Sequence, residues 1–263
     1  MTLIDTHAHL YYDDMYNNLD KVLDDALNNG VEKIVCIGTD LNTSKQSIDI
    51  ANEYDSVYAA VGIHPHDSKD VSKDYIKDLE TLVHSSEKVV AIGEIGIDHY
   101  RNISPKDIQQ KVMIEQMELA NSLSLPIIFH NRDADKDILD ILKHHPFKRA
   151  LAHCYSSNLS FAEKLLDLNV LLSFSGNVTF KKSINQSVIQ NITLTDFVLE
   201  TDCPFLAPQP YRGKPNEPKY VKDIATFISN LLDIEFEDIA MQTTKNAENF
   251  IKILLVSGPL VNK

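Results

Sequence analysis

Short runs of apolar and β-branched residues, alternating with longer amphipathic segments, set the strongest limit on how this chain can fold. Eight such runs fall at residues 3–9, 33–39, 57–64, 89–98, 127–132, 150–155, 170–175 and 197–202. Amphipathic segments separate them at residues 17–29, 44–52, 70–84, 106–121, 135–144, 160–168 and 181–190, and two more follow at 218–232 and 237–255. Strands that alternate with helices form a parallel sheet, and eight such units predict an α/β fold closed into a (β/α)8 TIM barrel.

The same alternation is compatible with an open, doubly wound sheet, which normally carries a glycine-rich phosphate loop after its first strand. Residues 7–10, HAHL, contain no glycine, so the barrel is favoured. No linker or low-complexity tract divides the 263 residues, a length typical of one barrel. We therefore expect a single domain over residues 1–263, with the proline-rich stretch 204–218 as a long loop over the barrel mouth.

The net charge of −13 at pH 7 argues against a protein that coats nucleic acid, because affinity for phosphate needs a positive surface. It does not exclude an enzyme that holds a phosphodiester at a metal site, since bound cations reverse the local charge. No stretch approaches the ~20 apolar residues that span a bilayer, and no signal peptide is visible. Cys36, Cys154 and Cys203 form no CxxC pair and read as small buried hydrophobic residues. We expect a cytoplasmic protein without a membrane partner.

Reactive side chains gather where the predicted strands end. The active face of a (β/α)8 barrel is built from the C-terminal ends of its strands, so side chains placed there are expected at one rim. Six stand at or near the ends of five strands: His7 and His9 on the first, Glu94 on the fourth, His130 on the fifth, His153 on the sixth and Asp202 on the eighth. The i, i+2 spacing of the first pair points both imidazoles to the same face of the strand.

Taken singly, each of these residues has an ordinary structural explanation. A lone histidine is more often a hydrogen-bonded core residue, and a strand-end aspartate often caps a backbone group. Together, four histidines and two carboxylates form a dense polar cluster, and burial of an unpaired polar group costs roughly 2–7 kcal/mol. A divalent metal satisfies such a cluster, and imidazole with carboxylate suits transition metals. The pattern therefore predicts a metal centre.

At these residues the sequence resembles the TatD family of metal-dependent deoxyribonucleases, within the wider superfamily of amidohydrolase-like barrels. The matching segments are residues 5–10 (DTHAHL), 61–66 (VGIHPH), 93–98 (GEIGID), 130–134 (HNRDA), 173–176 (SFSG), 199–208 (LETDCPFLAP) and 212–218 (RGKPNEP). They occur in the order typical of the family and extend from about residue 3 to about residue 250. The departures are small: Ser157 stands where the family usually has glycine, and His99 stands where tyrosine is common.

The resemblance implies two divalent metal ions, with zinc, manganese and magnesium as the candidates. It implies that His7, His9, Glu94 and Asp202 hold one ion, and that Glu94, His130 and His153 hold the second. Glu94 would then bridge the pair, because the two oxygens of one carboxylate can span ions about 3.5–4 Å apart. Four imidazoles favour zinc or manganese, whereas nuclease activity in the family favours magnesium.

The activity that the resemblance implies is hydrolysis of phosphodiester bonds, with DNA as the favoured nucleic acid substrate and no obligatory protein partner. Glu94 and Asp202 are the catalytic candidates, and Asp202 would accept the proton of a metal-activated water. Arg132 is expected to bind the phosphoryl oxygens, since a guanidinium matches phosphate geometry. Its structural alternative is a salt bridge with Asp133 or Asp135.

Other residues near the mouth are weaker candidates for substrate contacts. His66, Arg212 and Lys214 could hold the nucleic acid backbone, and His64 is explained as well by loop structure as by a substrate contact. An amide or ester hydrolase, such as an aminoacyl-tRNA deacylase, is the alternative on the same metal pair, because the site chemistry hardly separates phosphorus from a carbonyl carbon. A binding protein without catalysis would be expected to lack a ligand, and all six are present.

Overall fold

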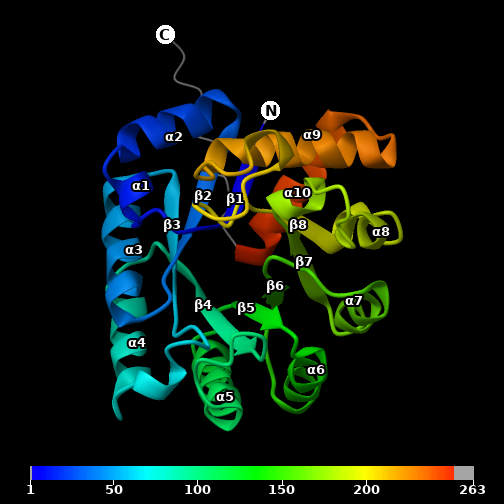
Figure 1. The fold of residues 1–263 in the computed structure, drawn as a ribbon. Coiled ribbons are helices and arrows are strands. Elements are labelled where there is room, and N and C mark those ends of the chain that lie inside the picture. The colour runs from blue at the N-terminus through cyan, green and yellow to red at the C-terminus, as the bar shows by residue number, and fades with distance from the viewer. Residues whose placement is uncertain (1, 252–263) are drawn as a thin grey trace.

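The computed structural model describes residues 2–251 and contains one sheet of eight parallel strands (Figure 1). The strands are β1 (Leu3–Ala8), β2 (Val31–Ile37), β3 (Val57–Val61), β4 (Val89–Asp98), β5 (Ile127–Arg132), β6 (Ala150–Ala152), β7 (Val170–Phe174) and β8 (Phe197–Leu199). Each strand pairs in parallel with the next one along the chain. The predicted (β/α)8 barrel is confirmed.

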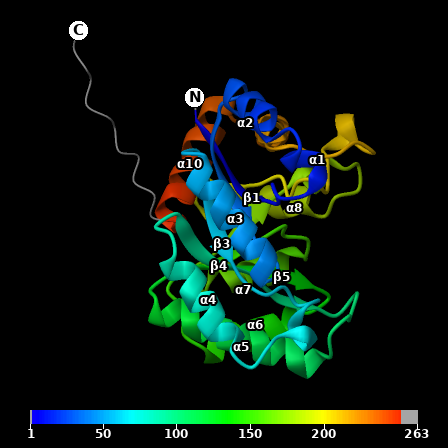
Figure 2. The same cartoon turned by 90° about the vertical axis from the view of Figure 1, so that its left-hand side faces the viewer.

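Helices surround the sheet on the outside (Figures 1 and 2). They are α1 (Asp13–Tyr16), α2 (Leu19–Asn28), α3 (Leu41–Glu53), α4 (Tyr75–His84), α5 (Lys106–Ser122), α6 (Asp135–His144), α7 (Leu159–Leu166), α8 (Asn185–Ile189), α9 (Val221–Leu232) and α10 (Phe236–Ile251). Short 3-10 turns are η1 (Ser68–Asp70), η2 (Gly176–Thr179), η3 (Leu194–Asp196), η4 (Gln209–Tyr211) and η5 (Pro218–Tyr220). Among residues 2–251, no helix has the length and apolar character needed to cross a bilayer.

Where the elements differ from their expected bounds, the causes are local. The helix expected at residues 181–190 is shortened to α8, and the Gln186 side chain within it donates hydrogen bonds to the carbonyls of Val178 and Phe180 in the segment before it. The helix expected at 237–255 begins one residue earlier, as α10, and its residues 252–255 lie outside the described part of the chain. The single domain over residues 1–263 also extends beyond that part and stays a prediction.

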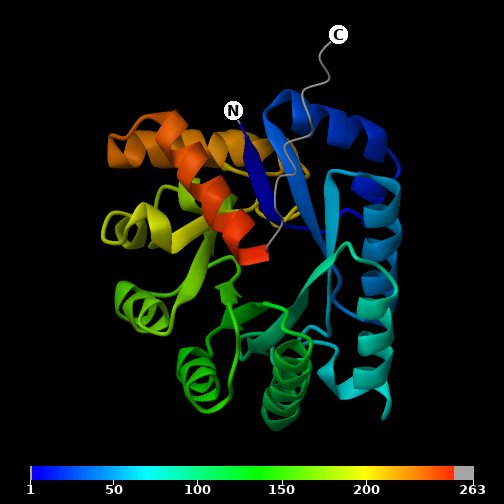
Figure 3. The same cartoon turned by 180° about the vertical axis from the view of Figure 1, so that it is seen from behind.

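The N-terminal end of the barrel is closed by α10, which crosses it diagonally (Figure 3). The Asn246 side chain of α10 donates a hydrogen bond of 2.7 Å to the carbonyl of Phe197, at the start of β8. The helix also contributes apolar side chains to the cluster that fills the barrel: Ala247, Phe250 and Ile251 pack with Ile4, Val35, Ile37, Ala60, Ile128, Leu151 and Val198 of the strands. Apolar side chains fill this end of the barrel, and the polar side chains of the strands lie at the opposite end.

The barrel is closed between β1 and β8 just beyond the ends of these strands. A parallel bridge joins Ala8 to Cys203. The backbone N–H of Asp202 donates to the carbonyl of His7, and that of His9 donates to the carbonyl of Cys203, both at 2.9 Å. The closure of the barrel therefore brings Asp202 next to His7 and His9, although it lies far from them in the sequence.

Deeper in the same seam, the buried carboxylate of Asp5 joins the two strands. It accepts hydrogen bonds from the backbone N–H of Thr201 (2.9 Å) and from its hydroxyl (2.5 Å), and a longer one from the backbone N–H of His7 (3.3 Å). A buried donor that has lost its hydrogen bonds to water and finds no other acceptor destabilises the fold. The Asp5 carboxylate prevents this by accepting hydrogen bonds from these donors.

We expect Asp5→Ala to lower the free energy of unfolding by about 2–4 kcal/mol, because it leaves buried donors of Thr201 without a partner. Urea unfolding of the chelator-treated protein measures this separately from any metal effect at the neighbouring His7. The matched control is Asp49→Ala, since Asp49 lies on the surface of α3 and, within residues 2–251, pairs with Lys45 alone. Its expected loss is below about 0.5 kcal/mol, and equal losses in the two variants would contradict the role given to Asp5.

Candidate metal centre

The C-terminal ends of the strands surround a cleft of about 730 Å³, a size typical of a small-molecule or nucleotide site. The cleft is lined by five of the six predicted residues: His9, Glu94, His130, His153 and Asp202. The sixth, His7, is fully buried directly beneath them, with its ring stacked on that of His153 at 3.8 Å. The structure thus brings all six predicted residues together at one end of the barrel.

Four side chains converge in a first cluster, made of His7, His9, Glu94 and Asp202. The Nε2 atoms of His7 and His9 lie 3.3 Å apart. Oε2 of Glu94 lies 3.5 and 3.9 Å from these two nitrogens, and Oδ1 of Asp202 lies 3.8 and 3.5 Å from them. Four ligands held tetrahedrally at about 2.0–2.2 Å from one ion are roughly 3.3–3.6 Å apart, so the donor set and its spacing fit a divalent metal.

A second cluster forms around the other oxygen of the same glutamate. Oε1 of Glu94 lies 3.0 Å from Nε2 of His153, 3.3 Å from Nδ1 of His130 and 3.5 Å from Nε2 of His64. The two oxygens of Glu94 therefore face two different groups of imidazole nitrogens. This is the arrangement expected of a carboxylate that bridges two ions.

The outer nitrogen of a metal-binding histidine normally donates to an oxygen acceptor, which fixes the tautomer and leaves the inner nitrogen free for the metal. Two of the histidines have an acceptor on the side away from the clusters: the carbonyl of Ile37 for His9 (2.9 Å) and Glu200 for His153 (3.2 Å). For His130 the group on that side is Asp98, whose Oδ2 lies 3.3 Å from Nε2 as an ion pair. These partners leave Nε2 of His9, Nε2 of His153 and Nδ1 of His130 unprotonated in the neutral ring, and each of these atoms faces Glu94.

His64 has the opposite tautomer. Its Nδ1 accepts a hydrogen bond from the backbone N–H of His66 (3.2 Å), and burial lowers its pKa to about 3, so the ring is neutral at pH 7. The single proton of the neutral ring therefore lies on Nε2, the atom that faces Glu94. His64 is thus suited to donate a hydrogen bond to Glu94 rather than to bind a metal. Of its two sequence interpretations, the structural one fits better.

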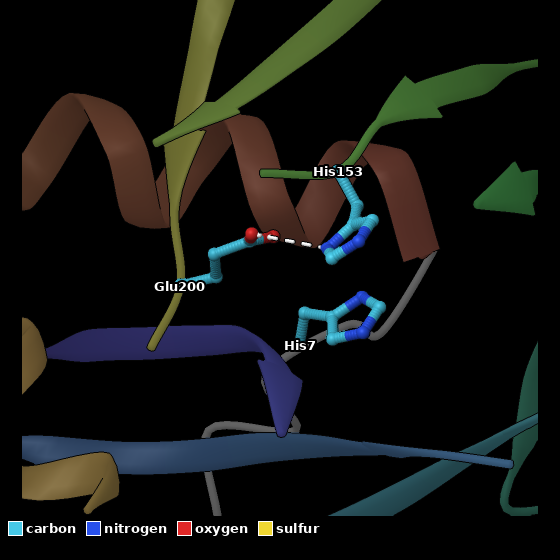
Figure 4. Close-up of side chains that lie close together, drawn as sticks. All are labelled: His7, His153 and Glu200. Carbon is cyan, nitrogen blue, oxygen red and sulfur yellow. Dashed lines mark hydrogen bonds and ion pairs between the residues drawn. The ribbon is translucent and has the colours of Figure 1, made fainter. Parts of the chain in front are cut away.

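Glu200 is a buried carboxylate beside the rings of His153 and His7 (Figure 4). Its Oε1 accepts hydrogen bonds from Nδ1 of His153 and from the backbone N–H of Cys154 (2.7 Å). Within the described residues, its Oε2 and Nδ1 of His7 both lack a hydrogen-bond partner. Ligand atoms of His7, His153 and Glu200 lie within 4.8 Å of one another, but the two rings are nearly parallel (17°), so their nitrogens point side by side and do not converge on one ion. The geometry suits a carboxylate that orients the ring of His153.

Glu200 and Asp98 were not among the residues predicted for the site. Both are acidic residues in otherwise apolar segments, directly next to or within the strand-end motifs. That is the signal available for them in the sequence. A period-2 pattern does not distinguish a carboxylate that supports a histidine from one that meets the metal.

In the protein without metal, the charges of the two clusters balance one another. Burial alone would lower the pKa of His153, but the negative charges of Glu94 and Glu200 raise it well above its usual range. Burial alone would also lower the pKa of His130, yet its contacts with Asp98 and Glu94 raise it. Burial alone would raise the pKa of Glu94, but the charge of His153 and the contacts with the surrounding imidazoles hold it well below its usual range. In the metal-free protein His153 and His130 thus keep their protons to a higher pH than a free imidazole does.

A family model described as TatD related DNase matches residues 4–252 of the chain. The chain belongs to this family. A relative in Bacillus subtilis, the uncharacterized metal-dependent hydrolase YabD, is 42% identical over 257 residues, which are 95% of this chain and 99% of the relative. YcfH of Escherichia coli K12, also named an uncharacterized metal-dependent hydrolase, is 34% identical over 94% of each chain.

Solved structures agree with this assignment. YjjV, a TatD homolog from Escherichia coli K12, has a TM-score of 0.92 and is 28% identical, over 96% of this chain and 98% of its own. A TatD family hydrolase from Entamoeba histolytica has a TM-score of 0.87 at 24% identity, over 95% and 98% of the two chains, which supports the fold alone. This TatD family member is therefore a metal-dependent hydrolase, with candidate ligand clusters in its cleft.

Of the residues expected to contact substrate, Arg132 and His66 line the cleft of this TatD hydrolase. The guanidinium of Arg132 lies over the ring of Tyr100, 4.0 Å from its centre, and among residues 2–251 it is not paired with Asp133 or Asp135. This leaves its N–H groups available to a ligand. Nε2 of His66 lies 2.9 Å from Oδ2 of Asp98.

The loop at residues 212–214 lies outside the lining of the cleft. Arg212 lies over the ring of Phe180, 4.4 Å from its centre, and neither Arg212 nor Lys214 lines the cleft. Packing on Phe180 holds the guanidinium away from the residues that line the cleft. A contact from Arg212 to a substrate in the cleft is therefore not supported.

The shared position of Glu94 predicts how metal content responds to substitution. Glu94→Ala should lower the content of divalent metal in both clusters, whereas Asp202→Ala should affect the first cluster alone. Mass-spectrometric metal analysis after dialysis against zinc or manganese measures the ions bound per chain. The matched control is Asp67→Asn, a carboxylate that lines the cleft outside both clusters. A Glu94→Ala protein with the metal content of the unmodified chain would contradict the shared cluster.

Metal binding should also release protons. His153 and His130 have raised pKa values in the metal-free protein, yet a histidine must be neutral to bind a metal. Affinity for zinc should therefore increase as the pH rises towards these raised pKa values. Calorimetric titration of the chelator-treated protein at pH 7, in two buffers with different heats of ionisation, should show about one proton or more released per chain. Binding heats that are equal in the two buffers would exclude this linkage.

Proposed function

We propose that this TatD hydrolase cleaves phosphodiester bonds of DNA with a pair of divalent metals. The observation that carries the proposal is the division of the Glu94 carboxylate between two clusters that open into one cleft. Paired sites of this kind suit attack on a phosphoryl group, because the attacking and the leaving oxygens can each lie near one ion. The description of the matching family as TatD related DNase supports the same activity.

In this proposal the residues of the first cluster would hold one divalent ion and those of the second cluster another, with Glu94 contributing to both. Such ions lower the pKa of a water molecule and offset the negative charge that develops on the phosphoryl oxygens. Asp202 is suited to accept the proton of the attacking water. Its side chain is 13% exposed, against 0% for His7 and 4% for His9. Burial alone would raise the pKa of Asp202. The hydrogen bond and charge of His9 and the charges of neighbouring histidines outweigh this effect and hold the pKa below its usual value, so the carboxylate is ionised.

Arg132 is the group in the cleft best suited to a phosphate. Its stacking on Tyr100 holds the planar guanidinium in one place, and a fixed guanidinium binds phosphate oxygens through two parallel hydrogen bonds. The net charge of −13 makes the surface as a whole repel nucleic acid. Local positive charge is therefore needed in the cleft, and Arg101 on the same wall adds to it.

The test is the rate of cleavage of a single-stranded DNA oligonucleotide with Mg²⁺, Mn²⁺ or Zn²⁺. We expect Arg132→Gln to lower kcat/KM by roughly 10- to 1,000-fold, because one charged donor to the phosphoryl oxygens is lost. The matched control is Arg212→Gln, which removes an arginine outside the cleft and should change kcat/KM by less than about twofold. Equal effects of the two substitutions would contradict the role of Arg132.

The same proteins, assayed on an aminoacyl-tRNA and on a cyclic amide, test the choice of substrate class. Glu94→Ala and His153→Ala should abolish cleavage of DNA, since each removes a residue of the second cluster. Turnover of a carbonyl substrate alone, with no cleavage of DNA under any of the three metals, would overturn the nuclease proposal.

A further inference from the structure

Two aromatic side chains stand exposed on one wall of the cleft. Tyr12 and Phe205 both line it, with 42% and 48% of their surfaces exposed. Their ring centres lie 5.6 Å apart at an interplanar angle of 81°, and each lies 6.1 Å from the centre of the His9 ring. The wall next to the first cluster is therefore apolar and open to a ligand in the cleft.

The positions of both rings are tied to the first cluster. The backbone N–H of Phe205 donates to the carbonyl of Asp202 (2.9 Å), and that of Tyr12 donates to the carbonyl of His9 (3.4 Å). Each aromatic residue thus follows a first-cluster residue by three positions, and its backbone hydrogen bond to that residue closes the turn between them. Since β1 and β8 meet at the seam of the barrel, the two turns bring the rings together.

The two rings differ in what covers their faces. Tyr12 is stacked on Tyr11, with ring centres 5.1 Å apart and an interplanar angle of 27°. Among the described residues, Phe205 has only the steeply inclined neighbours Tyr12 and His9 and no parallel ring. An aromatic residue whose role is to pack in the core would be buried, whereas about half of the Phe205 surface is exposed to solvent. Its free face suits a further planar ring.

We propose that Phe205, supported by Tyr12, is a stacking platform for the nucleobase next to the cleaved phosphodiester. The inference rests on the proposed DNA hydrolysis and names the part of the substrate that the cleft binds. Arg132 ends β5, which lies across the barrel from β1 and β8. The phosphate-binding group and the platform therefore lie on opposite sides of the clusters, and a nucleotide can reach both.

The chemistry of the platform defines the class of nucleic acid. Every base has a flat π face, so stacking on an aromatic ring gives affinity without a choice of sequence. A base within a duplex is already stacked and paired, and removing it costs free energy. The platform accordingly selects single-stranded DNA or frayed ends, with little preference among bases.

The test compares three substrates that each contain one phosphodiester: thymidylyl-thymidine and two analogues of it, one with an abasic residue on the 5′ side and one with an abasic residue on the 3′ side. In the unmodified protein, loss of the stacked base should lower kcat/KM by roughly 5- to 150-fold. Phe205→Ala should lower kcat/KM for the complete dinucleotide by a similar factor and should lose the discrimination against the abasic analogue. Phe205→Tyr, which keeps a ring, should retain both.

The matched control is Tyr16→Ala, because Tyr16 is 55% exposed on α1 and does not line the cleft. Its kinetics should equal those of the unmodified protein. Thermal unfolding and metal content of Phe205→Ala separate loss of the platform from loss of the fold or of the first cluster. Discrimination against the abasic analogue that persists unchanged in Phe205→Ala would overturn the platform, even while DNA cleavage itself continues.

A binding measurement distinguishes failure of the platform from failure of the proposed function. An uncleavable phosphorothioate oligonucleotide with 2-aminopurine at its ends should lose fluorescence on binding, because the base stacks on a ring. If the protein cleaves no DNA but this quenching depends on Phe205, the hydrolysis proposal fails and the platform stands. If quenching is absent, or is the same in Phe205→Ala, the platform is wrong whatever the activity.

Discussion

Glu94 is the residue on which the rest of the site depends, because its single carboxylate is shared by two groups of histidines. Its depth in the barrel requires neighbouring strands to approach closely. A Cβ at Gly93 would lie 2.8 Å from Ile128 of β5, and one at Gly62 would lie 2.8 Å from the backbone of Gly93. These glycines allow β4 to sit close to both neighbours, so Glu94 reaches the centre of the rim. Larger residues at these positions would displace the carboxylate before they affected any ligand directly.

The buried carboxylates and imidazoles of the site are tolerated because they are paired with one another, each carboxylate lying next to a histidine. A buried carboxylate or imidazolium without a partner is strongly unfavourable, and the metal-free protein avoids this by holding protons on His153 and His130 beside Glu94. The outer partners Glu200 and Asp98 then keep each ring oriented when those protons leave. The barrel can therefore fold with its site formed, and a metal would take the place of these protons.

The strands and most of the site are predictable from the sequence, whereas the loops are not. Period-2 apolar runs fix where strands lie, and the barrel geometry then places every strand end at one rim, which suffices for His7, His130 and His153. The same logic does not separate the metal-facing side chains from their supports, so His64, Asp98 and Glu200 need the tautomers and distances of the structure. Arg212 illustrates the limit for loops, because its contact with Phe180 depends on packing between two irregular segments. The single-domain extent of the chain stays a prediction.

The seam between β1 and β8 links the stability of the barrel to recognition in the cleft. Asp5 and the bridge between Ala8 and Cys203 close the sheet there, and the same closure brings the two halves of the first cluster together. The turns that follow carry Tyr12 and Phe205, so the apolar wall is a direct extension of the seam. Arg132, the positively charged group proposed to bind phosphate, lies at the end of β5 on the opposite side of the cleft. Changes in the β5 loop can therefore alter charge recognition independently, whereas changes at the seam affect stability, metal binding and the aromatic wall together.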